Sequence, residues 1–465
     1  RLHARAGLKM TELTRAGQAT ALALATVIFA CSARAAVAPD EAAALGTTLT
    51  GIGAEKAGNA DGRIPAYTGG LSQPPAGYKP GDGRLIDPFA DEKPLQVITR
   101  GDADGSADQL TAGTQELLRR YADFRVDVYP THRTMAYPEY LVAGTRRNAI
   151  DARATDGGLG FENVVAGVPF PIPRDGREVM WNHRLHYMGR MMEFTYDSWL
   201  VNSAGQRILT SVAQSQWGFP TVDPGHQAPL KQDEPIFQWR LEYTGPQRRA
   251  GEAVLFIESV NPIRSPRSVW QYLPGQRRVR KVDMPDEAPH GSSSGAYTND
   301  DAFVYTGALE HFDVKLLGKR EMLVPYNTYR LTYHANPREV LHDHHLNPDL
   351  LRWELHRVWL VEATLKPGEQ HAYSRRVFYV DEDTWAAVAS DEYGLDGQLL
   401  RTVYSLPSYN YVASVPFTVN HVSYDFGTGN YFTPFLPGPH GGVRYVEPPP
   451  AATWSPDALA GAGIR

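Results

Sequence analysis

Residues 351–404 constrain the fold more than any other part of the chain, because they hold four β-prone runs separated by three short breakers. The runs are rich in Val, Tyr, Trp, Phe and Thr, which strands favour. The breakers, at residues 366–369, 381–383 and 394–397, consist mainly of Gly, Pro and charged side chains. Connections this short leave room only for hairpins, so the segment is predicted to form a four-stranded antiparallel meander.

Side chains alternate in character along the first of these runs. The apolar set is Trp353, Leu355, Trp359, Val361, Ala363 and Leu365. The polar set is Arg352, Glu354, His356, Glu362 and Thr364. Because successive side chains of a strand point to opposite faces, we predict one core face and one mixed, solvent-facing side. The alternative is a strand that lines a ligand site.

Further β-prone runs follow one another from residue 191 to near residue 426. They span residues 191–201, 207–219, 237–243, 253–260, 268–273, 277–282, 323–333 and 417–426. Many strands at hairpin-scale spacing favour one sheet that limits its exposed edges by curling. The predicted fold class is therefore mainly β, of α+β type: a large curled antiparallel sheet or half-open β-barrel, with a few helices packed in or against it.

Residues 36–190 are predicted to form a strap and helices packed on the β domain of residues 191–465, so that residues 36–465 make one structural unit. The Gly-punctuated segment 52–89 carries hydrophobic anchors and is expected to be an ordered strap. Helices are expected at residues 40–45, 106–124, 162–166 and 175–188, with a helical turn at 300–309. Asp175 is the predicted N-cap of the 175–188 helix, because Glu178 stands three residues later, as in a capping box. The Pro- and Gly-rich tail from residue 434 is expected to be extended and poorly packed.

The N-terminus has the pattern of a secretory signal peptide over residues 1–35, with Met10 as a candidate true start. Arg15 supplies positive charge, residues 19–30 are apolar, and Ala33-Arg34-Ala35 gives a small-residue cleavage site. The alternative is a lipoprotein signal with acylation at Cys31, although Phe29 is bulky for such a motif. We therefore expect export to the bacterial periplasm.

Composition excludes several classes of function. The formal net charge of −6 is too weakly polarised for a nucleic-acid or membrane-surface role. Cys31 is the single cysteine, so cleavage after Ala35 leaves a mature chain without disulfides, thiolate metal sites or cysteine nucleophiles.

Two sequence motifs are similar to catalytic sites. Gly291 to Gly295 fits G-x-S-x-G with Ser293 as the nucleophile, but Pro289 precedes it and no strand–turn–helix context is evident. Glu354 and His356 share a strand face and offer an acid–base pair, although neighbouring Arg352 favours a structural charge ladder. We predict that the protein is not an enzyme and has no catalytic residue.

Two further motifs were tested for metal binding. His342, His344 and His345 form a dense imidazole cluster, and zinc would need three or four convergent ligands. Asn-Pro pairs on both sides favour an ordinary surface loop. The acidic run at residues 102–108 lacks the Gly and Glu of a calcium loop. No metal or cofactor is expected.

Aromatic residues on the predicted strands offer the remaining candidate site. Most must be core, since a large β-protein needs bulky residues between its layers. If part of the curled sheet is unfilled, the same residues line a cleft. The predicted cleft residues are Trp199, Trp270, Tyr272, Trp353, Trp359, Phe378 and Trp385. Burial of a 16-carbon acyl chain there would be favourable by roughly 10 kcal/mol.

Several segments resemble a known group of proteins. SVWQYLPGQRRVRKV at residues 268–282 resembles a hairpin of bacterial outer-membrane lipoprotein-sorting (Lol carrier-like) proteins, with Trp, Tyr and Pro-Gly before basic residues. RVFYVDEDTW and DEYGLDGQL, within residues 375–401, resemble the next shared element. With IGAEKAGNADGRIPAYTGGL and RWELHRVW, the mature chain resembles a bacterial periplasmic family of unassigned function, a domain of unknown function related to those sorting proteins.

The resemblance implies a half-open barrel wrapped around helices, an apolar cavity and transfer of lipid or lipoprotein between membranes. It also implies association with a resistance-nodulation-division type exporter and an outer-membrane protein, and it carries over no catalytic residue. We therefore expect a periplasmic carrier or accessory protein that binds a lipid or other hydrophobic small molecule. The alternatives are a packed structural or interaction module of an envelope complex, and a hydrolase.

Overall fold

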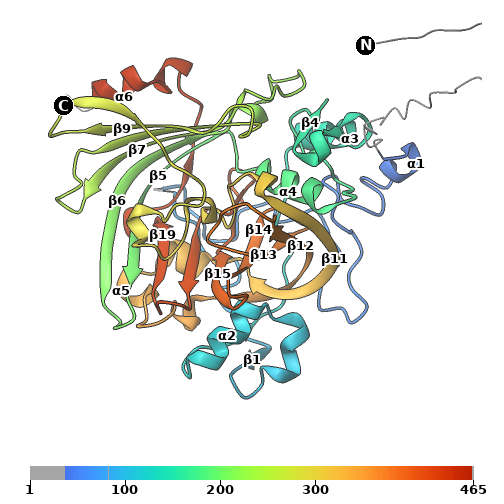
Figure 1. Cartoon of the computed structure of the whole chain (residues 1–465). Coiled ribbons are helices and arrows are strands. Elements are labelled where there is room, and N and C mark those ends of the chain that lie inside the picture. Colours follow the sequence, from blue (N-terminus) through green and yellow to red (C-terminus); the bar gives the residue numbers. More distant parts are fainter. Residues whose placement is uncertain (1–36, 82, 463–465) are drawn as a thin grey trace, which may run out of the picture. The chain divides into compact units, whose positions relative to one another are not determined.

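The β-prone runs pair into one sheet of 16 strands (Figure 1). The structure is a computed structural model that describes residues 37–81 and 83–462. In spatial order the strands are β1 (Gln96–Ile98), β2 (Val126–Val128), β12 (Trp353–Leu365), β13 (Arg375–Asp381), β14 (Ala387–Tyr393), β15 (Leu399–Ser405), β18 (His421–Asp425), β19 (Tyr431–Leu436), β5 (Met191–Val201), β6 (Arg207–Gly218), β7 (Pro235–Gly245), β8 (Ala253–Ser259), β9 (Ser268–Leu273) and β10 (Arg278–Val282). β11 (Phe312–Pro325) pairs with β12, and β20 (Arg444–Tyr445) pairs with β5. β1 and β10 end the path without pairing to each other, so the sheet is open and the predicted fold class is confirmed.

The meander predicted from residues 351–404 is present as β12 to β15, each antiparallel to the next. The expected bounds of the strands at residues 191–201 and 268–273 match β5 and β9. The strand expected at 323–333 is wrong: β11 ends at Pro325, and a π-helical turn, η7 (Arg330–His334), follows. Much of β11 is charged and partly exposed because it pairs only with β12, so its sequence lacks a continuous apolar face.

The helices agree less well with expectation. α4 (Gly176–Arg184) starts as predicted, and the Asp175 carboxylate accepts the N–H of Glu178 at 3.0 Å. The helix expected at 106–124 is a 3-10 turn, η1 (Asp104–Gln109), followed by α2 (Ala112–Arg120), because Thr111 caps α2. The helix expected at 162–166 is wrong, since β4 (Gly160–Glu162) and irregular backbone occupy it.

One helix was not predicted. α3 (Glu139–Asp151) buries Leu141, Thr145, Asn148 and Ala149, so its inner face is half polar and gives little helical periodicity in hydrophobicity. The Asn148 side chain accepts from the N–H of Val165 at 2.8 Å and donates to the Val165 carbonyl at 3.0 Å. Hydrogen bonds of this kind fix the following irregular segment onto the helix.

The prediction of a poorly packed tail is also wrong. Strand β19 is buried throughout and runs beside β5. The final helix, α6 (Pro456–Ala462), lies by β9 (Figure 1), and Leu459 and Trp454 are buried against the sheet. Pro434 does not end the sheet, because the register between β19 and β5 shifts between Thr433 and Leu436.

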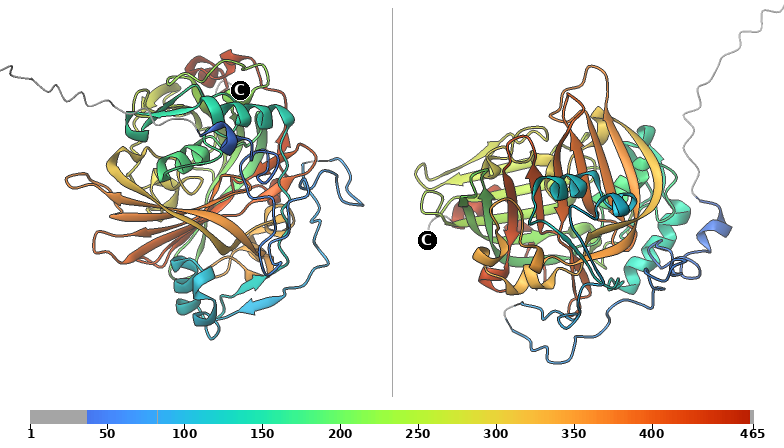
Figure 2. Two further views of the ribbon diagram at one scale, coloured as in Figure 1. Left: turned by 90° about the vertical axis from the view of Figure 1, so that its right-hand side faces the viewer. Right: turned by 90° about the horizontal axis from the view of Figure 1, so that it is seen from below.

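Three large core clusters lie around the sheet. The first joins β11 to β15 with residues 64–135, the second lies along β5 to β8, and the third lies against β12 to β14. Helix α4 contributes Trp181 to the second cluster and Val179 and Met180 to the third. Figures 1 and 2 show α4 among strands from both stretches of the sheet. This helix is therefore the element that positions the main cavity.

The predicted solvent-facing side of β12 is wrong in its first half. Glu354 and His356 are 0% and 1% exposed, because residues 130–133 and Asn327 cover that face. Only Glu362 and Thr364, near the far end of β12, reach solvent as expected.

The strap over residues 52–89 makes several contacts with the sheet. The Ile52 carbonyl accepts from Trp385 Nε1 at 2.8 Å, and the Ile86 N–H donates to the Tyr411 hydroxyl at 3.0 Å. Ile64 and Leu85 are buried in the first core cluster. The expected signal peptide and Cys31 lie outside the described residues, and within the described part no helix has the length and apolar character to cross a membrane.

Candidate functional site

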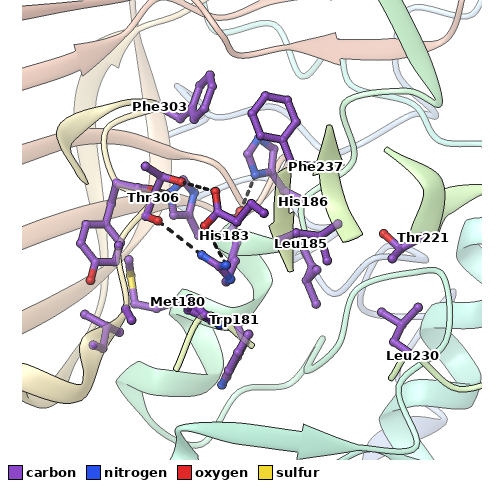
Figure 3. A pocket seen from close by; sticks show the side chains of 18 of the residues that line it. Met180, Trp181, His183, Leu185, His186, Thr221, Leu230, Phe237, Phe303 and Thr306 are labelled. Carbon is purple, nitrogen blue, oxygen red and sulfur yellow. Dashed lines mark hydrogen bonds and ion pairs between the residues drawn. The ribbon is translucent and has the colours of Figure 1, made fainter. Parts of the chain in front are cut away.

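An apolar cavity lies beside α4, in the part of the molecule shown in Figure 3. Its walls come from α4, the loop after β6, strands β7 and β8, and the loop of residues 303–309. A volume of about 90 Å³ is open to the centres of water-sized molecules, which is room for several waters or a slender apolar group. We call it the α4 cavity.

Local sequence explains why α4 sits where it does. Asp175 caps its first turn, and Gly176 lets the helix approach β11 and β12 closely. A Cβ at Gly176 would lie 2.9 Å from a methyl group of Val314 and 3.0 Å from one of Val361. A larger residue there would push the helix away from the strands and change the cavity.

Hydrophobic side chains from separate elements form most of the cavity wall. They include Met180, Leu185, Phe219, Val222, Leu230, Ile236, Phe237 and Phe303. Phe303 and Val304 both have positive φ, 57° and 70°, which is unusual for a bulky and a β-branched residue. This turn directs Phe303 to within 5.2 Å of Trp217 and 5.8 Å of Phe237, measured between ring centroids. Strained backbone is therefore part of the wall.

His183 on α4 and His186, two residues after its end, also line the cavity, and both are held in the neutral form. His183 Nδ1 accepts the N–H of Ala387 at 2.9 Å, so Nε2 carries the proton that it donates to the Tyr305 carbonyl at 2.8 Å. Burial lowers the pKa of His183 to about 3 and that of His186 to about 4. The pair therefore adds no positive charge to the wall at neutral pH.

Two of the charged groups at the cavity, Glu258 and Arg184, are paired with each other. Glu258 lies 2.7 Å from Arg184 and 3.6 Å from Arg267, with all three side chains nearly buried. Burial alone would raise the pKa of Glu258, but the two guanidinium groups lower it, so the carboxylate is ionised. The Thr306 hydroxyl donates to the same carboxylate at 3.3 Å (Figure 3).

The partly exposed lining residues mark the rim of the cavity. They include Leu159, Ala308 and Ile263, which is 41% exposed. Arg177 also lies here and donates to the carbonyls of Leu309 at 3.1 Å and Phe312 at 2.9 Å. Among the described residues no carboxylate forms an ion pair with it, and burial lowers its pKa. Arg177 thus has no ion-pair partner among the described residues, and Asp175, Asp313 and Glu310 act on its charge from farther away.

The seven aromatic residues predicted to line a cleft do not line the α4 cavity, and they fall into three separate clusters. Trp199 and Trp353 belong to the first core cluster, and Trp359, Phe378 and Trp385 to the third. Trp270 and Tyr272 pack with α6. The neighbours of Trp270 on β8 and β9, Phe256 and Val269, belong instead to the second cluster. Trp270 and Tyr272 therefore face away from the cavity.

Glu354 and His356 are adjacent, with 3.2 Å between Oε2 and Nε2, but they belong to a closed charge network. Glu354 is also paired with Arg352 and accepts from Asn327 at 2.9 Å. Burial opposes ionisation of Glu354, yet His356 and Arg352 lower its pKa to about 2. His356 lies 3.9 Å from Asp381, and burial and the charge of Asp383 raise the pKa of Asp381 to about 6. These contacts fit the prediction of a structural charge ladder rather than an acid–base pair.

The other tested motifs have plain surroundings. Ser293 is in a short 3-10 turn, η4 (Gly291–Ser293), and its hydroxyl donates to the His290 carbonyl at 2.8 Å. No helix follows as a nucleophile elbow requires.

In the described part of the chain, two groups bring three potential metal ligands together: Asp123 with His342 and His345, and His356 with Asp381 and Asp383.

Sequence reasoning missed the α4 cavity because its residues come from distant segments. One signal was present: the 175–188 helix carries Met180, Trp181, Leu185 and Met188 on several sides, more apolar surface than one packed face needs. A helix buried on two sides is what such a pattern predicts.

Comparison with known proteins gives consistent family matches. The family model described as "Protein of unknown function (DUF1329)" matches residues 97–460. A Pseudomonas aeruginosa protein named "Uncharacterized protein PA3922" is 40% identical over 416 residues, which cover 88% of this chain and 90% of the relative.

Three solved structures are similar at low identity. A domain named for outer-membrane lipoprotein sorting, from Vibrio parahaemolyticus, is 12% identical with a TM-score of 0.41, covering 61% of this chain and 97% of that one. A DUF1329 family protein from Desulfovibrio piger is 14% identical with a TM-score of 0.40, covering 58% and 92%. A LolA superfamily protein from Nitrosomonas europaea is 10% identical with a TM-score of 0.35, covering 62% and 100%.

Proposed function

We propose that this chain, which belongs to the DUF1329 family, binds the apolar chain of an amphiphile in the α4 cavity and acts as a carrier in the cell envelope. The observation that carries the proposal is the composition of the wall. Apolar side chains dominate it, the two histidines are neutral, and Glu258 is neutralised by arginines. Such a wall favours a ligand without charge along its length.

The rim supports an anionic head on that ligand. Arg177 already donates to two carbonyls, which fix its guanidinium without neutralising it. A carboxylate or phosphate that reached Arg177 would gain a charge-assisted hydrogen bond in a partly desolvated place. Each methylene buried deeper in the cavity would add about 0.8 kcal/mol. A fatty acid or a single-chain phospholipid has this combination of groups.

The alternatives have less support from the contacts. A fully packed interaction module would not need the cavity, although large clusters of buried residues lie around the sheet. A hydrolase built on Glu354 and His356 would have to admit substrate to side chains that are at most 1% exposed and not part of the cavity. We therefore propose binding without catalysis. We further propose that handover involves an exporter of resistance-nodulation-division type and an outer-membrane protein.

The test is to purify the protein from the envelope fraction of its host without detergent and to measure its mass under native conditions. Organic extraction then identifies what is bound. The proposal expects about one amphiphile per chain, and palmitate should bind again after delipidation. Absence of an adduct, together with no binding of palmitate, would overturn it.

Palmitate and hexadecanol share the same chain length and differ in the anionic head, so comparing them separates the contribution of the head to binding from that of the chain. Arg177→Gln should weaken palmitate binding by about tenfold, the scale of one charge-assisted hydrogen bond, and should leave hexadecanol binding unchanged. Equal loss for both ligands would show that Arg177 acts on the cavity shape rather than on the anionic head.

A further inference from the structure

His345 has an unusual environment for a buried histidine. Its side chain is 0% exposed, and Nδ1 lies 2.9 Å from the carbonyl oxygen of Leu346. A carbonyl can only accept, so Nδ1 carries the proton. Nε2 is buried and makes no hydrogen bond of good geometry in the described part of the chain, and Asp123 Oδ1 lies 3.3 Å from it. This ring nitrogen is therefore available as a ligand.

The free nitrogen faces two other potential ligands. Asp123 Oδ1 lies 3.3 Å from His345 Nε2, and one ligand atom each from Asp123, His342 and His345 lie within 4.8 Å of one another. With Nδ1 as the donor to Leu346, Nε2 and Asp123 Oδ1 are two ligand atoms that a cation between them would join.

Both segments are held in place before any ligand arrives. Residues 342–345 form a turn, which we call the histidine turn. The bridge between Leu341 and Leu346 closes it, and the His342 N–H donates to the His345 carbonyl at 3.0 Å. The Tyr431 hydroxyl donates to the His342 carbonyl at 2.6 Å. Asp123 lies between α2 and β2, where the next residue, Phe124, contacts the His345 ring edge to face at 5.3 Å.

We propose that Asp123, His342 and His345 form a Zn²⁺ site that keeps one position open to solvent. Two imidazole nitrogens and one carboxylate oxygen suit zinc, whereas Mg²⁺ and Ca²⁺ prefer oxygen ligands alone. In a tetrahedral site with bonds of about 2.0–2.1 Å, two ligand atoms lie roughly 3.3 Å apart, and the contact between His345 and Asp123 has this length. The Nδ1 hydrogen bond to Leu346 is the outer contact that zinc-binding histidines usually make.

Water completes the coordination from the exposed side. The Asp123 side chain is 73% exposed, so the site opens to solvent while His345 closes its inner wall. Neighbouring Asp343 is paired with Arg207 at 3.0 Å, and the His344 ring stacks on Tyr121 with 5.2 Å between centroids. His344 is therefore a matched control within the same turn.

The experiment uses the full chain without a histidine tag, treated with chelator and titrated with ZnCl₂ in competition with a chromogenic chelator. The proposal expects one zinc per chain. Asp123→Ala and His342→Ala should each weaken zinc binding by more than about tenfold, since even outer contacts of such sites are worth 10–100-fold. His344→Ala should bind zinc as the wild type does. Both Asp123 and His342 are accessible to solvent, so these variants should keep the fold.

Cobalt gives a second, spectroscopic readout. Co²⁺ in this site should give visible absorption bands of a tetrahedral nitrogen–oxygen complex, which His345→Gln should abolish. Failure of the wild type to bind zinc would overturn the proposal. Binding that Asp123→Ala and His342→Ala leave unchanged, or that His344→Ala reduces equally, would also overturn it.

Discussion

His183 on α4 accepts the backbone N–H of Ala387, the first residue of β14, over 2.9 Å. The same ring donates to the Tyr305 carbonyl at 2.8 Å, so one neutral imidazole joins α4, strand β14 of the meander and the loop of residues 303–309. A protonated ring could not accept from Ala387. The geometry of the α4 cavity thus depends on His183 remaining uncharged.

Stability should fall with acidification below the pKa of an unfolded histidine. Because burial lowers the pKa of His183 and His186 to about 3 and 4, the unfolded state binds more protons than the folded state from about pH 6.5 downwards. Their contribution is complete above pH 6.5 and decreases toward pH 4. Between pH 6.5 and 4.5, the free energy of unfolding of His186→Gln should fall by about 2–3 kcal/mol less than that of the wild type, as measured by urea unfolding.

The comparison between these two proteins cancels other titrating groups. Glu392, whose pKa burial and the charge of Asp301 raise to about 8, acts in the opposite direction but equally in both. If the free energy of unfolding depended on pH identically in the wild type and His186→Gln, the buried histidine would not cause the loss of stability in acid.

Removal of the buried carboxylate at the cavity should be costly. Glu258→Gln leaves Arg184 buried without an anion and leaves Arg267 with Asp286 alone, so the free energy of unfolding should fall by about 3–5 kcal/mol. Glu242→Gln, at an exposed position of neighbouring β7, should change it by less than about 0.5 kcal/mol. Equilibrium unfolding of both variants measures the difference, and similar values would show that the ion pairs contribute little.

Gly158 should control the position of Arg177. Its φ is +88°, and a Cβ there would lie 2.6 Å from Arg177 Cδ. Gly158→Ala should lower stability by about 1–2 kcal/mol through the left-handed backbone and should also weaken palmitate binding by displacing Arg177. Gly157→Ala is the control, because Gly157 has φ +67° and no atom within 4 Å of its added Cβ. That variant should share the loss of stability and keep the affinity for palmitate.

The bond between Trp385 and the strap should be measurable by proteolysis. Trp385→Phe removes the Nε1–H donor to the Ile52 carbonyl, so it should cost about 1 kcal/mol and speed cleavage within the strap. Trp359→Phe is the matched change, since Trp359 Nε1 is buried without a hydrogen-bond partner in the described residues. Faster cleavage in both variants would indicate a general loosening of the sheet.

Short-range sequence patterns predicted the sheet well. Strands β5, β9 and β12 to β15 follow from β-prone runs between turn residues, because hairpins are set by local sequence. Strand β11 and helix α3 escaped prediction since their burial depends on distant partners: β11 is charged along an edge, and α3 turns Thr145 and Asn148 inward.

The candidate sites could be predicted only in part. Aromatic residues such as Trp385 were recognisable as buried, but the sequence could not show which buried positions adjoin empty space. The histidine turn was visible in the sequence, whereas Asp123 reaches it through the fold. Pairing His342 with His345 rather than with His344 required the geometry of the turn.

Two additions of tryptophan decide whether the α4 cavity holds the amphiphile. Ala308→Trp fills the rim of the α4 cavity, and Leu395→Trp adds the same side chain at a site that is already 74% exposed. Both proteins are purified from the envelope without detergent, and the bound amphiphile per chain is measured by native mass spectrometry. We expect about one amphiphile per chain in the wild type and in Leu395→Trp, and nearly none in Ala308→Trp. Equal occupancy in all three, with the folds intact, would place the ligand elsewhere and contradict binding in the α4 cavity.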